Sequence, residues 1–359
     1  MKVCFLVHNS AKDTGHGIDR YSYEVVNRFR REYDITVLDN GKLNTPFDRL
    51  TNEFTFPFKL VGTKADVYHA LSQQLAKAAV FTNKRPLVTT IHDLIPFRDS
   101  ITAFYQKKLS LRDRVQLEYM KTCTLLAKSS DIIITSCEVI KRDIVSTLRI
   151  KPDKIKIVPY GVDTEFFRPL NVENYSIRKK QGRKVIFFIG GLSVAKGADI
   201  LLKAFSEVLK KNKDVELWIS GKFVFFDGME FVKKLDIKEN LRFIGYVPEE
   251  NLPIYYNLAD VVVLPSKIGF SFPVLEAMAC RRPVITSDTP DIKEILGDSV
   301  LLVDPTNVEQ LTERLLHILE DKSLQEKISH RGYQKATSLS WDITVSKTLD
   351  IYTELRDFF

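Results

Sequence analysis

A carboxylate follows a glycine loop in the stretch Ser266–Asp288, SKIGFSFPVLEAMACRRPVITSD. The apolar run Val261–Leu264 before it is too short for a helix and rich in β-branched residues, which predicts a buried strand. Gly269 lets the backbone approach a ligand closely, and good helix formers follow Pro273. Because amides at a helix amino end favour anions, this strand, loop and helix predict a phosphate site. Glu276, one turn into the helix, is placed to reach a sugar hydroxyl or, alternatively, only to stabilise the helix dipole.

A lysine lies in a second glycine-rich loop, GGLSVAKG at residues 190–197. The loop follows a predicted strand at 185–189 and precedes a predicted helix at Ala198–Lys211. A cation at a helix amino end opposes the helix dipole, so an anionic ligand is the better explanation for Lys196.

A histidine ends a further predicted strand. His92 and Asp93 follow Leu87–Ile91, at the strand end where parallel sheets present side chains to ligands. A single histidine at such a place is more often structural, so the residues alone leave both roles open.

The first loop, His8–Tyr21, carries Gly15 and Gly17 ahead of a predicted helix. Arg20 occupies the last glycine position of the G-x-G-x-x-G pattern, so the dinucleotide-binding fingerprint is missing. This argues against an NAD-dependent oxidoreductase.

Strand and helix patterns alternate along the whole chain, which predicts parallel sheets covered by helices. The polar stretch RPLNVENYSIRKKQGRK at 168–184 interrupts the alternation and is the predicted linker. We therefore expect an α/β protein with two doubly wound, Rossmann-like domains at 1–167 and 185–340, followed by a helix within 341–359. Such sheets bind ligands beyond the carboxyl ends of their strands, which predicts a site in a cleft between the two domains.

Composition favours a globular protein that acts in the cytoplasm. The chain has 359 residues, 44% hydrophobic and 28% charged, and its amino terminus lacks the apolar core of a signal peptide. The four cysteines have neither metal-binding spacing nor a disulfide framework. The formal net charge of +7 is moderate, and the interleaved basic and aromatic residues that bind single-stranded nucleic acid are absent, so no nucleic-acid partner is expected.

One segment is more basic than the rest. Residues 102–128 contain six basic side chains against two acidic ones, Asp113 and Glu118. Such a face is most often only solvated, and the alternative is peripheral contact with a membrane surface, on its cytoplasmic side.

Three motifs together resemble one enzyme family. GFSFPVLEAMAC at 269–280, GIDRY at 17–21 and TIHDLIPF at 90–97 are similar to the signatures of the retaining, nucleotide-sugar-dependent glycosyltransferases of family four (glycosyl transferases group 1). The first motif is long and specific. The resemblance implies the GT-B architecture of two Rossmann-like domains, and a last helix that crosses back to the first domain.

The resemblance also assigns roles to residues. It implies that His92 lies beside the reacting centre and that Lys196 holds the leaving pyrophosphate. The remaining donor-binding residues that it implies, or that lie in the implied loops, are Gly17, Lys267, Gly269, Phe270, Ser271, Glu276 and Tyr246.

Two positions depart from the family pattern. Ile268 stands where the family has a second glutamate near the transferred sugar, and Gly191 stands where it has an arginine that joins the lysine on the pyrophosphate. Lys267, two positions before Gly269, is the first candidate to replace that arginine. The implied activity is transfer of a hexosyl unit from a UDP- or GDP-sugar to a hydroxyl of a glycan or lipid-linked acceptor, with retention of configuration and without a metal or other cofactor. The alternative is a GT-B-like protein that binds a nucleotide sugar with weak or no transfer.

Overall fold

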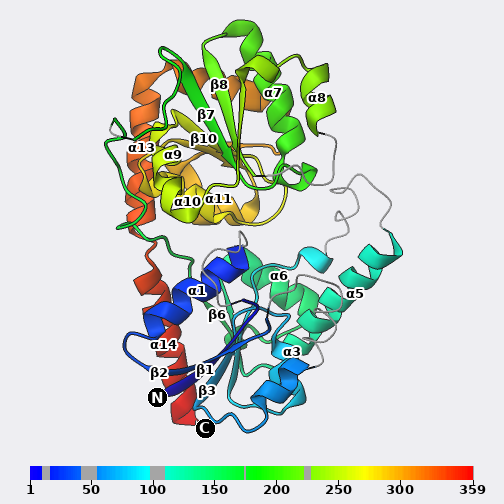
Figure 1. Cartoon of the computed structure of the whole chain (residues 1–359). Helices are drawn as coiled ribbons and strands as arrows, with labels where there is room; N and C mark the ends of the chain where they lie inside the picture. Colours follow the sequence, from blue (N-terminus) through cyan, green and yellow to red (C-terminus); the bar gives the residue numbers. More distant parts are fainter. Residues whose placement is uncertain (10–16, 42–54, 98–109, 174, 222–227, 359) are drawn as a thin grey trace. The chain divides into compact units, whose positions relative to one another are not determined.

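The computed structural model describes residues 1–9, 17–41, 55–97, 110–173, 175–221 and 228–358, which form two compact α/β units (Figure 1). The first unit consists of the described residues up to 161 together with the carboxy-terminal residues from 341. The second unit is built from the described residues of 162–340.

The first unit is organised around a six-stranded parallel sheet in the order β2-β1-β3-β4-β5-β6. Its strands are β1 (Lys2–Val7), β2 (Asp34–Asp39), β3 (Val67–Ala70), β4 (Leu87–Thr90), β5 (Ile132–Thr135) and β6 (Ile155–Ile157). Because the strand order reverses between β1 and β3, the carboxyl ends of these two strands flank a topological switch point, where such sheets bind ligands.

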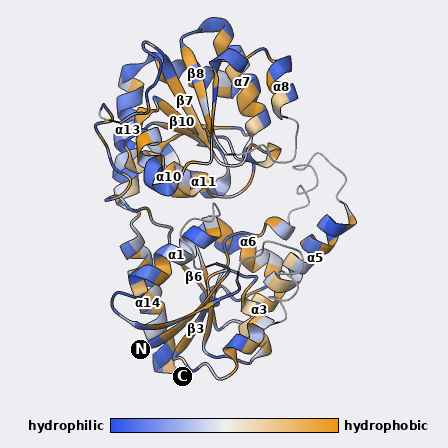
Figure 2. Ribbon diagram, in the orientation of Figure 1, coloured by the Kyte–Doolittle hydropathy of each residue, from blue (hydrophilic) through white to orange (hydrophobic). Residues whose placement is uncertain are grey.

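The second unit has a six-stranded parallel sheet in the order β12-β11-β10-β7-β8-β9. Its strands are β7 (Lys184–Ile189), β8 (Val215–Ser220), β9 (Leu241–Gly245), β10 (Val261–Leu264), β11 (Val284–Ser287) and β12 (Leu301–Val303). The order reverses between β7 and β10, which pair directly through Val261 with Ile186 and Val262 with Phe187. Apart from Lys184 at the start of β7, these central strands are apolar, as expected for strands with helices on both faces (Figure 2).

Helices follow most strands and supply the rest of both cores. The described helices used below or visible in Figure 1 are α1 (Gly17–Phe29), α3 (Ala76–Phe81), α5 (Leu111–Leu126), α6 (Glu138–Leu148), α7 (Ala198–Lys211), α8 (Gly228–Lys234), α9 (Leu252–Leu258), α10 (Phe272–Ala279), α11 (Pro290–Leu296), α12 (Val308–Glu320), α13 (Lys322–Thr337) and α14 (Trp341–Phe358). In the part of the chain that is described, no helix is both long enough and apolar enough to cross a membrane.

Helix α14 packs into the first unit through buried aromatic and polar contacts. Tyr352 is fully buried, and its ring lies 5.5 Å from that of Phe29. Its hydroxyl is hydrogen-bonded to Nδ1 of the buried His69, whose Nε2 lies 2.9 Å from Oγ1 of Thr90. The side chain of Tyr21 reaches the same Thr90 oxygen at 3.3 Å. The carboxy-terminal helix is therefore joined to β3, β4 and α1 by one hydrogen-bonded chain.

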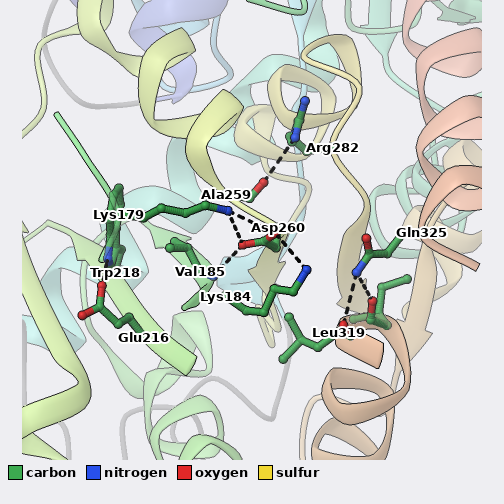
Figure 3. Close-up of polar contacts among 11 residues, drawn as sticks. Lys179, Lys184, Val185, Glu216, Trp218, Ala259, Asp260, Arg282, Leu319 and Gln325 are labelled. Atoms are coloured by element: carbon green, nitrogen blue, oxygen red, sulfur yellow. Dashed lines mark hydrogen bonds and ion pairs between the residues drawn. The ribbon is translucent and has the colours of Figure 1, made fainter. Parts of the chain in front are cut away.

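The segment predicted as a linker, 168–184, is held on the second unit. The Asn257 side chain accepts from the Leu170 amide and donates to the Arg168 carbonyl, both at 2.9 Å. Figure 3 shows Lys179 and the start of β7 converging on the Asp260 carboxylate, which lies 3.1 Å from the Lys179 ammonium. The sequence placed the end of the first domain at 167, whereas the structure assigns 162 onward to the second unit. The difference arises because Val162 and Phe167, at 4% and 1% exposure, are buried in the core of the second unit.

We predict that His69 makes the first unit sensitive to acid. Burial, with a smaller contribution from His92, lowers the pKa of His69 from 6.5 to about 3. Between these values the unfolded chain binds one more proton than the folded chain, so the free energy of unfolding falls as the pH falls, by up to ~1.4 kcal/mol per pH unit from this residue. Denaturant unfolding at a series of pH values measures this dependence. In His69→Gln the free energy of unfolding should fall less steeply with pH, whereas Tyr352→Phe retains the imidazole and should keep the wild-type slope. An unchanged slope in His69→Gln would contradict the prediction.

Candidate functional site

Two loops meet at the switch point of the second sheet. The Lys267 amide, just after β10, donates to the Ala195 carbonyl in the loop after β7 at 2.9 Å. Gly197 has a left-handed φ of +72°, and a Cβ placed there would collide with the backbone carbonyl of Pro265. The glycine is therefore required both by its conformation and by the close approach of the two backbones.

The two lysines of these loops have different surroundings. The Nζ atom of Lys267 lies 3.2 and 3.3 Å from the two carboxylate oxygens of Asp199 in the first turn of α7, and its side chain is only 9% exposed. Lys196 is half-buried, and its backbone amide donates to the carbonyl and hydroxyl of Ser193. The charge of Lys267 is thus already balanced by a carboxylate inside the unit.

Glycines allow the carboxyl ends of three neighbouring strands to come close together. The Gly190 amide donates to the Ser220 carbonyl at 3.0 Å, and the Gly221 amide donates to the Gly245 carbonyl at 2.9 Å. A Cβ at Gly221 would collide with the Gly190 carbonyl. Tyr246, next after β9, is 54% exposed. In the strand order, β9 is separated from β10 by β8 and β7.

Glu276 is buried inside the unit. It is 2% exposed on α10, and its Oε2 accepts a hydrogen bond of 2.7 Å from the hydroxyl of Tyr256 on α9. A buried carboxylate is stable only when its oxygens are hydrogen-bonded. The interpretation of Glu276 as a surface carboxylate that only supports the helix dipole is therefore wrong.

The loop between β10 and α10 is half-exposed. Gly269 has a φ of +63°, and the rings of Phe270 and Phe272 make an edge contact at 6.2 Å. The Ser266 hydroxyl donates to the Ile268 carbonyl at 2.6 Å, which fixes the turn before the glycine. Ser271 caps α10 by position without a side-chain hydrogen bond.

His92 lies in the first unit with both ring nitrogens engaged. Its Nε2 is 2.9 Å from the Leu71 carbonyl, which requires an N–H at that nitrogen, and its Nδ1 therefore accepts from the Tyr160 hydroxyl at 2.9 Å. Burial lowers the pKa of His92 below its usual value of 6.5, although the Leu71 carbonyl and Asp93 oppose the shift. The ring is therefore a neutral imidazole of defined tautomer at pH 7.

Aromatic rings fix the orientation of that imidazole. Tyr21 contacts it edge-on at 4.9 Å, and Tyr160 stacks on it at 5.9 Å. The Gln73 side chain lies against the same loop, with Nε2 3.3 Å from the Asp93 carbonyl. Gly17 is the exposed first residue of α1. Gly15 lies outside the described residues, as do residues 102–109 of the predicted basic segment.

The structure thus gathers one group of the predicted residues, and it reveals partners that the sequence did not. Lys196, Lys267, Gly269, Phe270, Ser271 and Glu276 belong to the two loops that meet beside β7 and β10 and to the helix after them. His92 and Gly17 lie in the first unit. The partners Asp199, Tyr256 and Tyr160 were not predicted, because their proximity depends on packing between segments far apart in the sequence.

The fold and the three sequence motifs define a glycosyltransferase of the GT-B architecture. Residues 15–166 match the model of Glycosyltransferase Family 4, and residues 173–335 match that of Glycosyl transferases group 1. The chain belongs to this family, as the motifs predicted.

Curated relatives carry glycosyltransferase names. The chain is 28% identical over 275 residues to the O-antigen chain mannosyltransferase B of Escherichia coli, an alignment that covers 74% of this chain and 69% of that protein. It is also 28% identical over 279 residues to the MMP alpha-(1->4)-mannosyltransferase of Mycolicibacterium hassiacum, covering 74% of this chain and 65% of the relative. Several alignments span less than two thirds of the relative, among them 62% of an uncharacterised glycosyltransferase of Methanocaldococcus jannaschii.

Solved structures share the fold over the full chain. Sucrose-phosphate synthase from Thermosynechococcus elongatus superposes with a TM-score of 0.83 at 17% identity, covering 100% of both chains. HepE of Anabaena in complex with UDP-glucose superposes with a TM-score of 0.77 at 16% identity, covering 99% of this chain and 100% of that one. At these identities the likeness establishes the fold alone.

We predict that Gly197→Ala destabilises the second unit. The left-handed backbone costs a non-glycine residue ~1 kcal/mol, and the collision with Pro265 adds roughly 1–3 kcal/mol because the two loops must separate. Gly182→Ala is the matched control, since Gly182 has a φ of +78° but no atom within 4 Å of the place that a Cβ would take. Denaturant unfolding of both variants should show the larger loss for Gly197→Ala, and equal losses would contradict the predicted collision.

Proposed function

We propose that this glycosyltransferase transfers a hexosyl unit from a nucleotide diphosphate sugar, UDP- or GDP-linked, to a hydroxyl group and retains the anomeric configuration. The observation that carries the proposal is the meeting of the Lys196 loop with the loop before Glu276 at the switch point of the second sheet, the place where such sheets hold nucleotides. In this proposal the nucleotide sugar is a co-substrate, and no metal or other cofactor takes part.

The donor-binding residues have different roles in this proposal. Glu276 accepts hydrogen bonds from the ribose hydroxyls, and Gly269, Phe270 and Ser271 bring backbone amides to the pyrophosphate. Lys196 supplies the positive charge as the bond to the sugar breaks. Lys267 is a weaker candidate, since Asp199 lies 3.2 Å from its ammonium.

His92 contributes in its neutral form. Both ring nitrogens are committed to Leu71 and Tyr160, so the side chain is suited to shape and polarity beside the transferred sugar and not to proton transfer. Tyr246 is proposed to contact the nucleotide base, and Gly17 is proposed to contact the pyrophosphate. These assignments rest on the motif positions.

The proposed acceptor is a glycan or a lipid-linked hydroxyl. The E. coli relative is named for an O-antigen chain, which supports an acceptor of this class. A lipid-linked acceptor would place the enzyme at the cytoplasmic face of a membrane, as a peripheral protein.

A screen of nucleotide diphosphate sugars tests the proposal. Purified protein should bind one donor preferentially and transfer its sugar to a glycan acceptor, with the configuration of the product determined by proton NMR and the reaction repeated in EDTA. Tight nucleotide-sugar binding without transfer to any acceptor would favour the alternative of a binding protein, to which Ile268 and Gly191 point. Loss of transfer in EDTA would contradict the metal-independent mechanism.

We predict that Glu276→Ala weakens nucleotide binding. A hydrogen bond to a charged group contributes ~1.5–3 kcal/mol, so loss of one such bond should raise the nucleotide Kd roughly ten- to hundredfold. Tyr256→Phe removes the hydroxyl that bonds Oε2 but keeps the carboxylate, and it should change the Kd less. Calorimetric titration checks both, and unchanged affinity in a folded Glu276→Ala protein would exclude the ribose role.

We also predict that Lys196 matters more to turnover than Lys267. Removing a charge that acts mainly in the transition state should lower kcat, roughly a hundredfold for Lys196→Ala, with a smaller effect on nucleoside monophosphate affinity. Lys267→Ala removes a charge already balanced by Asp199 and should lower kcat less. Steady-state kinetics of both variants measure the two effects. A larger loss of kcat in Lys267→Ala than in Lys196→Ala would make Lys267 the pyrophosphate ligand.

A further inference from the structure

Helix α5 exposes apolar side chains on its outer face. Leu111 is 79% exposed, Val115 63% and Leu125 46%. At about 100° per residue, spacings of four and fourteen place these three within one narrow sector of the helix. Figure 2 shows both hydrophobic and hydrophilic residues along α5. The helix therefore has an apolar stripe that faces solvent.

The opposite face of α5 packs into the first unit. Cys123 and Thr124 are each 1% exposed, and Ala127, just beyond the helix, is fully buried. The apolar stripe is therefore separate from the core-facing side. Residues 110–116 are all exposed, so the first turns of the helix stand clear of the body of the unit.

The exposed start of α5 is a regular helix in spite of its exposure. The Ser110 hydroxyl accepts from the Asp113 amide at 3.2 Å, and the Asp113 carboxylate accepts from the Ser110 amide at 3.0 Å. This capping box satisfies amides at the helix end that would otherwise lack partners, and Asp113 is thereby committed to the helix start. A row of solvent-facing Leu and Val side chains is costly in water, which indicates a partner for the stripe.

Basic residues border the stripe on both sides. By the same helical spacing, Arg112 lies along one margin and Arg114 and Lys121 lie along the other. The one acidic residue within the stripe, Glu118, is paired with Lys121 at 2.8 Å. An apolar stripe bordered on both sides by basic residues is the arrangement of helices that lie in the interface of a bilayer with anionic lipid.

We infer that the outer face of α5, formed by Leu111, Val115, Leu125, Arg112 and Arg114, docks on an anionic membrane surface. The basic margins favour anionic lipid headgroups over a second copy of this chain, whose net charge is also positive, +7. This inference deepens the proposed function, on which its biological meaning rests, by naming the surface that would bring the enzyme to a lipid-linked acceptor.

Vesicle co-sedimentation of the full chain tests the inference. The protein should bind vesicles of phosphatidylglycerol and phosphatidylcholine in equal parts, bind phosphatidylcholine alone much less, and dissociate as salt is raised. Arg112→Gln with Arg114→Gln should lower partitioning about 25-fold, since each basic residue contributes about fivefold. Leu111→Ser with Val115→Ser should lower it at least tenfold. The matched control is Met229→Ser, an exposed apolar residue on α8 of the second unit, which should bind as the wild type does.

Three results would overturn the inference. The first is that the wild type does not bind anionic vesicles, and the second is that both double variants bind as the wild type does. The third is that the wild type is a dimer and the Leu111→Ser, Val115→Ser variant a monomer, which would assign the stripe to a second copy. Because the variants leave the second unit intact, their nucleotide affinity should equal that of the wild type. Vesicle binding without donor-dependent transfer would defeat the proposed function and leave the membrane contact standing.

Discussion

The close backbone contact between the β7 and β10 loops is the constraint on which the candidate donor site depends. The strands pair directly, so their following loops leave the sheet side by side, and Gly197 permits the final approach to Pro265. The amide of Lys267 then bonds to the carbonyl of Ala195. One consequence is that the Lys196 loop and the amino end of α10 are fixed relative to each other before any ligand binds. Preorganised amides and charges of this kind stabilise developing negative charge without reorganisation in the reaction.

Charge inside the second unit is distributed unevenly around that contact. Asp199 stabilises the start of α7 and at the same time balances Lys267, so the ion pair ties the helix to the loop after β10. Such a pair has a structural effect whether or not a ligand is present. Gly191, in the place of the family's arginine, leaves the β7 loop with Lys196 as its one basic side chain between residues 190 and 197. On the proposed donor role of this loop, the pyrophosphate would be held by Lys196 together with backbone amides.

The fold could be predicted from the sequence because strands that are buried on both faces have continuous apolar runs. The runs Val261–Leu264 and 185–189 are apolar without interruption and rich in β-branched residues, and both lie in central strands. Local signals also located the loops that carry Lys196 and Glu276. They did not reveal Tyr256 or Asp199 as partners, since no spacing rule connects residues 20 or 68 positions apart. Nor did the polar composition of 168–184 show that Asn257 and Asp260 bind residues of this segment, because these partners also lie far away in the sequence.

Two histidines of the first unit, the buried His69 and the half-buried His92, show how packing inside this unit can orient a candidate site residue. His69 and His92 are both held neutral by burial, and each has both ring nitrogens engaged. Tyr21 connects them, since it bonds to Thr90 beside His69 and contacts the His92 ring edge-on. Because Tyr352 on α14 stands at the far end of this chain, the packing of the carboxy-terminal helix is connected to the His92 ring through three hydrogen bonds and the ring contact of Tyr21. A substitution that weakens the packing of α14 would therefore change the orientation of the His92 ring by breaking hydroxyl hydrogen bonds and shifting the Tyr21 ring. No residue of the second unit would need to change.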